Sequence, residues 1–423
     1  MNNVSAHRAF SFLRTYGYER VSCSKEERTV AEALLNECTS LGVSAQMEEF
    51  TVPCGRVSHA LLRVTSPYVK EYEVTGYERA ASTPEGGLDA EFLYVENADE
   101  VLLEQAKGKI VLVNGYLNRA TYEKLRKAEA AAILTFTGRT IDRENESDLN
   151  RCKLRETLTE PFGAIPVLNM RAASAAEIVR RGAKTVHIEL TGECYDGTSQ
   201  NVCATIPGTD KPSEVITLGG HYDSVYFSSG VHDNLSGSVI VLELLRYFAA
   251  HPPRRTLRFC WFGSEEQGLL GSKAYVKAHA DELKDCVAML NFDVAAPTLG
   301  SNHLVTLATD DALHYVTGVL REAGYGVRAR QDTYSSDCIP FADNGVPAIN
   351  LARFGANGAD YMHNRHDSLK SGYLDEHALD ITLQQGFVLL ERLANAASFP
   401  IKREITPEIR QKVDEYLFKA KKE

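Results

Sequence analysis

The chain has 423 residues, a length typical of two or three domains, and 44% of them are hydrophobic, which is enough for a sizeable core. Its 46 Lys and Arg against 57 Asp and Glu give a formal net charge of −11, which argues against nucleic acid or an anionic membrane as a partner. No segment approaches the roughly 18 uninterrupted apolar residues of a membrane-spanning helix. The first residues lack a signal-peptide pattern and the nine cysteines never pair as CxxC, so we expect a cytoplasmic protein with free thiols.

An α/β pattern begins the chain and is then interrupted. Apolar spacing predicts helices over residues 6–16 and 25–41, followed by a strand over 43–52 that Pro53 ends. From about Ser58 the sequence changes to short strands and Pro/Gly-rich turns, with one βαβ-like unit and no cluster of metal ligands. We therefore expect four parts: a main domain beginning at 1–57, an inserted small domain at 58–192, the rest of the main domain at 193–400, and a charged helical tail at 401–423.

Polar side chains follow three predicted buried strands of the main domain, over 215–220, 256–262 and 287–292. In open α/β sheets, ligands bind outside the carboxyl ends of the strands, so these side chains are expected to lie close together. Neutral imidazole and carboxylate bind zinc, and one carboxylate has two oxygens with which to bridge two ions. The side chains concerned are His221 and Asp223 after the first strand, Asp233 at the start of the next helix, Glu265 and Glu266 after the second strand, and Asp293 after the third.

Each of these residues also has a purely structural interpretation. The segment 264–267 has the pattern of a helix capping box, Asp233 could be an ordinary N-cap, and Asp223 could close a turn. Their joint position at strand ends favours a site for divalent metals over three unrelated structural roles.

At this point several ordered motifs resemble those of the two-zinc exopeptidases of clan MH, which include bacterial leucyl-type zinc aminopeptidases and glutamate carboxypeptidase. The motifs are GGHYDSV, GVHDNLSG, the Glu265–Glu266 pair, NFD, SSDCIPFADNGVPAI and HNRHD. The resemblance implies an α/β fold with a mixed, mostly parallel central sheet flanked by helices. The inserted region, with its GKIVLV strand, resembles a smaller α/β protease-associated domain.

The resemblance also implies roles for single residues. One zinc ion would be held by His221 and Asp293, the other by Glu266 and His363, with Asp233 bridging them and joined to Asn234 by a cis peptide. Glu265 would be the general base, while Asp223 and Asp367 would orient the two histidines. Two zinc ions balance the charge of three ligand carboxylates and a hydroxide. Because Met362 replaces the tyrosine common before the last histidine, Tyr334 is a candidate for stabilising the oxyanion. His363 is preferred to His366 as a ligand because Asp367 then falls four residues later, as in the family.

From these roles we expect a metallo-aminopeptidase that uses two Zn²⁺ per chain, with Co²⁺ or Mn²⁺ possible, and that acts on peptides with a free N-terminus. Two alternatives stay open: a carboxypeptidase of the same clan, for which Arg353 and Arg365 are candidates to bind the substrate carboxylate, and an inactive receptor-like binding protein. A single-zinc cyclising transferase is a further rival. Oligomeric state and side-chain specificity stay open as well.

Overall fold

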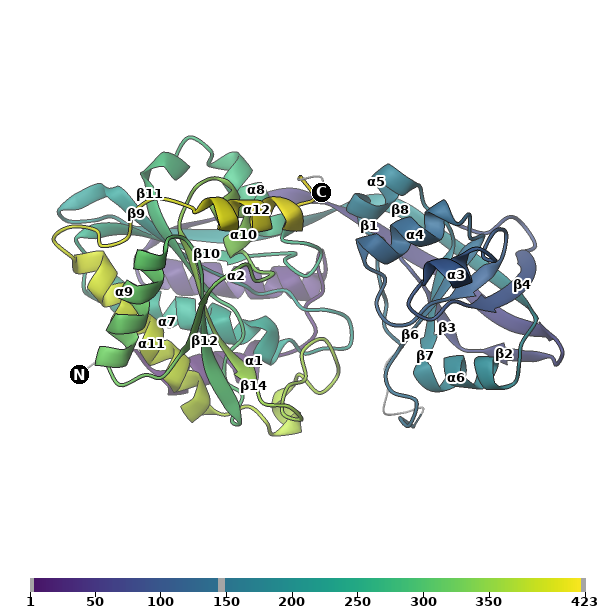
Figure 1. Cartoon of the computed structure of the whole chain (residues 1–423). Coiled ribbons are helices and arrows are strands. Elements are labelled where there is room, and N and C mark those ends of the chain that lie inside the picture. Colours follow the sequence, from purple (N-terminus) through teal and green to yellow (C-terminus); the bar gives the residue numbers. More distant parts are fainter. Residues whose placement is uncertain (1–3, 144–148, 420–423) are drawn as a thin grey trace. The chain divides into compact units, whose positions relative to one another are not determined.

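The computed structural model describes residues 4–143 and 149–419 (Figure 1). The chain divides into two compact units: unit 1 comprises Met1–Val52 and Thr198–Glu423, and unit 2 comprises Pro53–Gly197. The insertion therefore begins five residues earlier and ends five residues later than the sequence pattern indicated. Among the described residues, no helix is both long and apolar enough to cross a membrane. All nine cysteines lie in the described part of the chain and carry free thiols.

Unit 1 is built on a mixed, mostly parallel sheet with the strand order β13-β12-β14-β11-β9-β10-β8. The pairs β9–β10, β9–β11, β11–β14 and β12–β13 are parallel, whereas β8–β10 and β12–β14 are antiparallel. This is the sheet type that the sequence predicted. The strands are β8 (Thr185–Ile206), β9 (Lys211–His221), β10 (Arg255–Phe262), β11 (Cys286–Phe292), β12 (Gly300–Leu307), β13 (Arg328–Gln331) and β14 (Ala348–Gly355).

Helices cover this sheet, and one of them is central. Helix α7 (Ser236–Ala250) buries nearly every residue of its first three turns, packing on β9, β10 and β11 on one side and on α1 and α11 on the other. The helices of unit 1 are α1 (Ala6–Tyr16), α2 (Lys25–Ser40), α7, α8 (Leu270–Ala278), α9 (Asp310–Glu322), α10 (Cys338–Asp343), α11 (Glu376–Asn395) and α12 (Pro407–Tyr416). The predicted helical tail is α12, and the last four residues lie outside the described part.

Unit 2 has a sheet and cores of its own. Its strands run in the order β4-β5-β6-β7-β3; the four from β4 to β7 are parallel, and β3 pairs antiparallel with β7. The elements are β2 (Lys70–Tyr72), β3 (Val74–Gly76), β4 (Leu88–Tyr94), β5 (Ile110–Leu112), β6 (Ala132–Thr137), β7 (Val167–Arg171), α3 (Glu100–Leu103), α4 (Arg119–Lys127), α5 (Glu156–Phe162) and α6 (Ala172–Arg180). Two apolar clusters form the core of the unit, and one of them also contains residues of β8 and of the long strand β1 (Ser44–Ser66).

Two strands are much longer than the sequence indicated. Strand β1 runs over Ser44–Ser66 through Pro53, where we predicted its end, and β8 joins the two strands predicted at 185–190 and 202–206. A proline removes only one backbone donor, so a strand at a sheet edge can continue past it. In β8 the residues between the two predicted strands are mostly exposed, because backbone pairing between strands does not require apolar side chains.

Candidate metal centre

The polar residues singled out from the sequence meet at one edge of the unit 1 sheet. His221 is the last residue of β9 and lies opposite Phe262, the last residue of the parallel strand β10. Asp293 directly follows β11, which also runs parallel to β9. The common direction of the three strands therefore brings their carboxyl ends, and the side chains that follow them, to the same rim.

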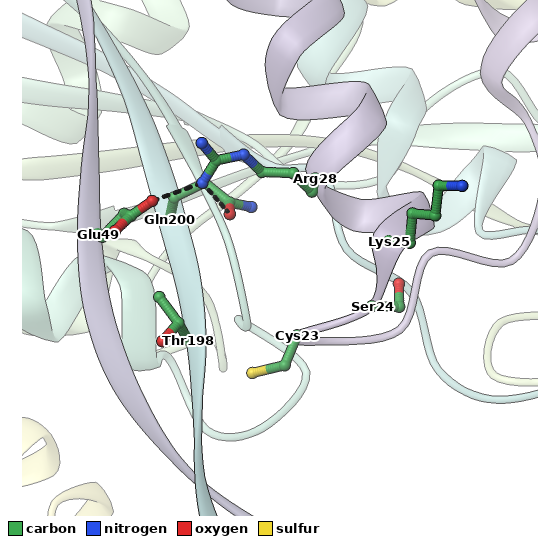
Figure 2. A pocket seen from close by; sticks show the side chains of 7 residues that line it. All are labelled: Cys23, Ser24, Lys25, Arg28, Glu49, Thr198 and Gln200. Atoms are coloured by element: carbon green, nitrogen blue, oxygen red, sulfur yellow. Dashed lines mark hydrogen bonds and ion pairs between the residues drawn. The ribbon is translucent and has the colours of Figure 1, made fainter.

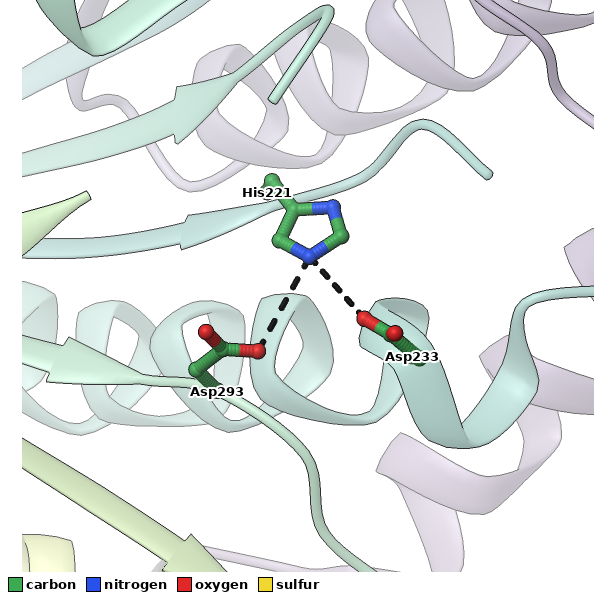
Figure 3. A group of neighbouring side chains, drawn as sticks. All are labelled: His221, Asp233 and Asp293. Carbon is green, nitrogen blue, oxygen red and sulfur yellow. Dashed lines mark hydrogen bonds and ion pairs between the residues drawn. The ribbon is translucent and has the colours of Figure 1, made fainter. Parts of the chain in front are cut away.

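A first group of three ligand-type side chains is buried at this rim (Figure 3). Nε2 of His221 lies 3.1 Å from Oδ1 of Asp233 and 3.8 Å from Oδ1 of Asp293. The three residues are between 2% and 7% exposed. One atom from each lies within 4.8 Å of the others, close enough to share a single ion.

A second group of three shares Asp233 with the first. Nε2 of His363 lies 2.9 Å from Oδ2 of Asp233 and 3.1 Å from Oε2 of Glu266. The two oxygens of Asp233 thus face different histidines, which is the arrangement that a bridging carboxylate requires. Imidazole and carboxylate donors fit zinc, so the residues present match the metal that the sequence resemblance implies.

The segment around Asp233 departs from a regular helix. It forms the π-helical turn η1 (Val231–Leu235), in which Asp233 and Asn234 have non-helical backbone angles and the peptide between them is cis, as expected from the resemblance. The Asn234 side chain donates to the carbonyl of Phe292 at 2.8 Å and accepts from the N–H of Val294 at 3.0 Å. These two bonds fix the turn against the chain on both sides of Asp293.

The local structural interpretations of Asp233 and of the segment 264–267 do not hold. Helix α7 begins after Leu235, whose N-cap position has no side-chain hydrogen bond, so Asp233 does not cap it. Glu265 and Glu266 lie in a turn before α8, which begins only at Leu270, so the predicted capping box is absent there. The pattern of a capping box was present, but the backbone at Ser264 takes a positive φ of 55° instead of entering a helix.

Asp223 holds the Glu265–Glu266 turn in place. It is fully buried, and its Oδ1 and Oδ2 accept the backbone N–H groups of Glu265 at 3.0 Å and Glu266 at 3.2 Å. The same Oδ1 lies 3.2 Å from Nδ1 of His221, without the alignment of a full hydrogen bond. A single carboxylate therefore orients both a histidine and the two glutamates.

Glu265 lies beside the first group without belonging to either set of three. Its Oε2 is 3.8 Å from Nε2 of His221. Burial raises the pKa of Glu265 well above its ordinary value; His221 opposes this shift, and Asp337 and Glu266 add to it. Burial also raises the pKa of Asp233, but the hydrogen bonds from His221 and His363 outweigh it and hold that pKa below the ordinary range.

Tyr334 lies close enough for the acidic rim to act on it. Burial raises the pKa of its hydroxyl well above the ordinary value, and the charges of Asp293, Asp233 and Glu265 raise it further. Its ring packs edge-on against Phe354, with the ring centroids 5.5 Å apart. The hydroxyl therefore stays protonated and able to donate a hydrogen bond.

The histidine-rich loop corrects one expectation. His363 approaches the carboxylates, whereas the ring of His366 packs against Tyr361. Asp367, which we expected to orient His363, instead accepts the backbone N–H groups of His232 at 2.7 Å and Asp233 at 3.0 Å. The four-residue spacing between His363 and Asp367 places that carboxylate under the bridging turn, since the loop does not continue as a helix.

Three buried charged residues near the rim were not found from the sequence as parts of the site. Glu27 of α2 accepts the backbone N–H of Ser264 at 3.1 Å, and burial together with the nearby Asp223 raises its pKa to about 8. Asp337 is fully buried before α10, where burial raises its pKa to about 7. Arg20, between α1 and α2, is also fully buried. Asp337 lies in the SSDCIPFADNGVPAI motif, but no role was assigned to it; nothing local in the sequence distinguishes Glu27 and Arg20 from solvent-exposed charges.

A cavity of about 480 Å³ lies elsewhere in unit 1 (Figure 2). Arg28 on its wall bonds to Glu49 at 2.6 Å and to Gln200 at 3.4 Å. The remaining lining residues are Cys23, Ser24, Lys25 and Thr198. The candidate ligands are not among them, so this cavity is distinct from the metal centre.

Part of the chain matches a known family, and most of the chain is similar to known proteins. Residues 201–384 match the model of peptidase family M28. The chain is 28% identical to aminopeptidase YwaD of Bacillus subtilis over 78% of this chain and 71% of that protein. It is 27% identical to carboxypeptidase Q of Mus musculus over 66% of this chain and 62% of that protein, so it spans less than two thirds of this second relative.

A solved structure shares the fold. The structure of BSAP, a zinc aminopeptidase from Bacillus subtilis, superposes with a TM-score of 0.78 at 21% sequence identity and covers 96% of this chain and 100% of that one. At this identity the likeness establishes the fold alone.

Proposed function

We propose that the chain is a zinc aminopeptidase of peptidase family M28, whose model matches residues 201–384, and that it hydrolyses the first peptide bond of substrates with a free N-terminus. The observation that carries the proposal is the sharing of Asp233 between two groups, with one oxygen facing His221 and the other facing His363. We propose that His221 and Asp293 hold one zinc ion, that Glu266 and His363 hold a second, and that Asp233 bridges them. Co²⁺ or Mn²⁺ can replace zinc in such a donor set.

The residues around the proposed metal sites have separate roles in proton transfer and in stabilising the oxyanion. Zinc supplies Lewis acidity, which lowers the pKa of a bound water and polarises the scissile carbonyl. Glu265 takes the proton of the attacking water on its carboxylate and returns it to the leaving amine. The Tyr334 hydroxyl donates to the developing oxyanion.

The direction of cleavage follows from the charge of the rim. Asp233, Glu265, Glu266 and Asp293 are all buried or nearly so, and three of them face His221. Unit charges about 4 Å apart interact by about 4 kcal/mol at the screening typical near a protein surface. When two zinc ions neutralise the ligand carboxylates, the charge left at the rim is that of Glu265, which in its ionised form attracts a substrate ammonium and repels a substrate carboxylate.

Of the two arginines considered for binding a substrate carboxylate in a carboxypeptidase, Arg353 makes structural hydrogen bonds instead. The guanidinium of Arg353 is buried and donates to the carbonyls of Pro297 at 3.0 Å and Thr298 at 3.3 Å, and to Oδ1 of Asn302 at 2.9 Å. These bonds give Arg353 a structural role and leave it poorly placed to bind a substrate carboxylate. An inactive binding protein is disfavoured because all five proposed ligands come together at one rim.

A substrate panel tests the proposal. The protein loaded with zinc should cleave an aminoacyl nitroanilide and leave its N-acetyl form intact. Cleavage that needs a free C-terminal carboxylate would instead make the chain a carboxypeptidase, and equal cleavage of the acetylated substrate would make it an endopeptidase. The variants Glu265→Gln and Glu266→Gln separate the roles of the two glutamates. The first should keep its zinc and lose turnover by about 10²–10⁴-fold, whereas the second should lose zinc.

A further inference from the structure

Arg20 contacts the loop that joins two of the proposed metal ligands, although it lies about 200 residues before this loop in the sequence. The residue stands between α1 and α2 and has no exposed surface. Its guanidinium donates from Nε to the carbonyl of Tyr222 at 2.7 Å, from Nη1 to that of Ser229 at 2.7 Å, and from Nη2 to that of Gly230 at 2.8 Å. All three acceptors belong to one loop, residues 222–230.

This loop connects the parts of the site. It begins directly after His221, contains Asp223 and ends three residues before Asp233. The backbone of Arg20 holds the loop as well: its N–H donates to Oγ of Ser224 at 2.8 Å, and its carbonyl accepts the N–H of Ser224 at 3.1 Å. Arg20 therefore fixes both ends of the segment that separates a terminal ligand from the bridging one.

The charge of Arg20 adds to this geometric role. Burial lowers the pKa of the guanidinium to about 10, and the carboxylates of Asp367, Asp223 and Asp233 act in the opposite direction. The group therefore stays protonated at neutral pH. Because its hydrogen-bond acceptors in the loop are neutral carbonyls, its positive charge acts through space on these buried acids.

We propose that Arg20 is a positioning residue for the metal centre: by bonding to both ends of the loop 222–230, it holds the proposed ligands His221 and Asp233 at a fixed separation. Arg20 lies outside residues 201–384, the part that matches the family model. The inference depends on the proposed metal centre. Residues that orient metal ligands typically contribute 10–100-fold to metal affinity, which is the effect expected here.

A pair of conservative substitutions tests the inference. Arg20→Lys keeps the charge but cannot reach three carbonyls at once. Arg255→Lys is the matched control, because Arg255 is equally buried and donates to the carbonyls of Leu393 and Ala396 at the opposite end of β10. Zinc affinity is measured by calorimetry on the metal-free full-length chain, and thermal unfolding is measured with and without zinc.

The two substitutions should differ in their effect on zinc affinity and on the rise in unfolding temperature that zinc produces. Arg20→Lys should weaken zinc binding by at least tenfold and shrink the rise in unfolding temperature that zinc produces, since stabilisation by a ligand follows its affinity. Arg255→Lys should lower both unfolding temperatures equally and leave the affinity unchanged. An Arg20→Lys protein with unchanged zinc affinity would overturn the inference. A wild-type chain that binds no zinc would overturn the proposed function together with it.

If Arg20→Lys does not fold, Ser224→Ala replaces it. This variant removes the hydroxyl that receives the Arg20 N–H and leaves the guanidinium in place. It should weaken zinc binding in the same direction but to a smaller extent. An affinity equal to that of the wild type in a folded Ser224→Ala protein would overturn the inference as well.

Discussion

Replacing Asp223 by asparagine tests how the turn that carries Glu265 and Glu266 is held. The aspartate gives one oxygen to each of the two backbone N–H groups, at 3.0 and 3.2 Å, with no exposed surface. An asparagine of the same shape has one oxygen, so one bond is lost and an NH₂ group is brought against the second N–H. A hydrogen bond to a charged group contributes about 1.5–3 kcal/mol, and leaving a buried donor unpaired adds to the loss. We expect Asp223→Asn to lower the free energy of unfolding of the metal-free protein by about 3 kcal/mol.

Urea unfolding measures this effect through a single probe. Trp261 is the only tryptophan of the chain and is fully buried in β10 of unit 1, so its fluorescence follows the unfolding of that unit. The midpoint should fall while the slope stays unchanged. The control is Asp375→Asn, because Asp375 caps α11 by accepting the N–H of Ala378 and asparagine caps helices equally well. A loss below about 1 kcal/mol for Asp223→Asn would refute the reasoning, since it would mean that the paired bonds do not hold the turn.

Two further predictions concern histidines. His363→Ala should lower the zinc content by about one ion per chain, whereas His366→Ala should leave it unchanged, and elemental analysis showing equal contents would contradict the assignment. Burial lowers the pKa of His279, but Glu48 and Glu282, at 3.0 and 3.1 Å from its ring nitrogens, raise it above the ordinary value. The charged form is thus favoured in the folded state, so this contribution to stability is complete below the unfolded pKa of about 6.5 and is lost as the pH rises through the folded pKa. Glu48→Gln should flatten the decline in stability above pH 6.5, and an unaltered slope would count against the ion pair.

The sequence predicted those parts of the site that have a local signal. Buried strands are short apolar runs, and the polar residues that follow them are visible in the sequence, so His221, Glu266 and Asp293 could be assigned to one rim. The α/β alternation also predicted most helices and strands. The continuation of β1 past Pro53 was missed, because Pro53 and Gly55 are residues that ordinarily mark the end of a strand.

The supporting contacts could not be predicted in the same way. Arg20 follows Tyr18 and Glu19 in a polar stretch between two helices, where a charged side chain is ordinarily exposed. Its burial depends on a loop 200 residues later. The contact of Asp367 was also not predictable from the sequence. Its spacing from His363 suggested a contact with that histidine, but in the irregular loop its carboxylate instead accepts backbone N–H groups of the turn that contains Asp233.

The structure assigns two different tasks to the buried acids of this rim. Asp223 and Asp367 each accept a pair of consecutive backbone N–H groups, and Glu27 accepts the one at Ser264. Such bonds satisfy part of the hydrogen-bonding capacity of each carboxylate without any cation, while the acids fix the turns that carry the ligands. Asp233 and Glu266 instead direct oxygens at the imidazole of His363. The carboxylates that do not bond to the backbone are therefore concentrated where the metals are proposed to bind. This difference between the two sets of acids explains how one small rim can hold many buried carboxylates.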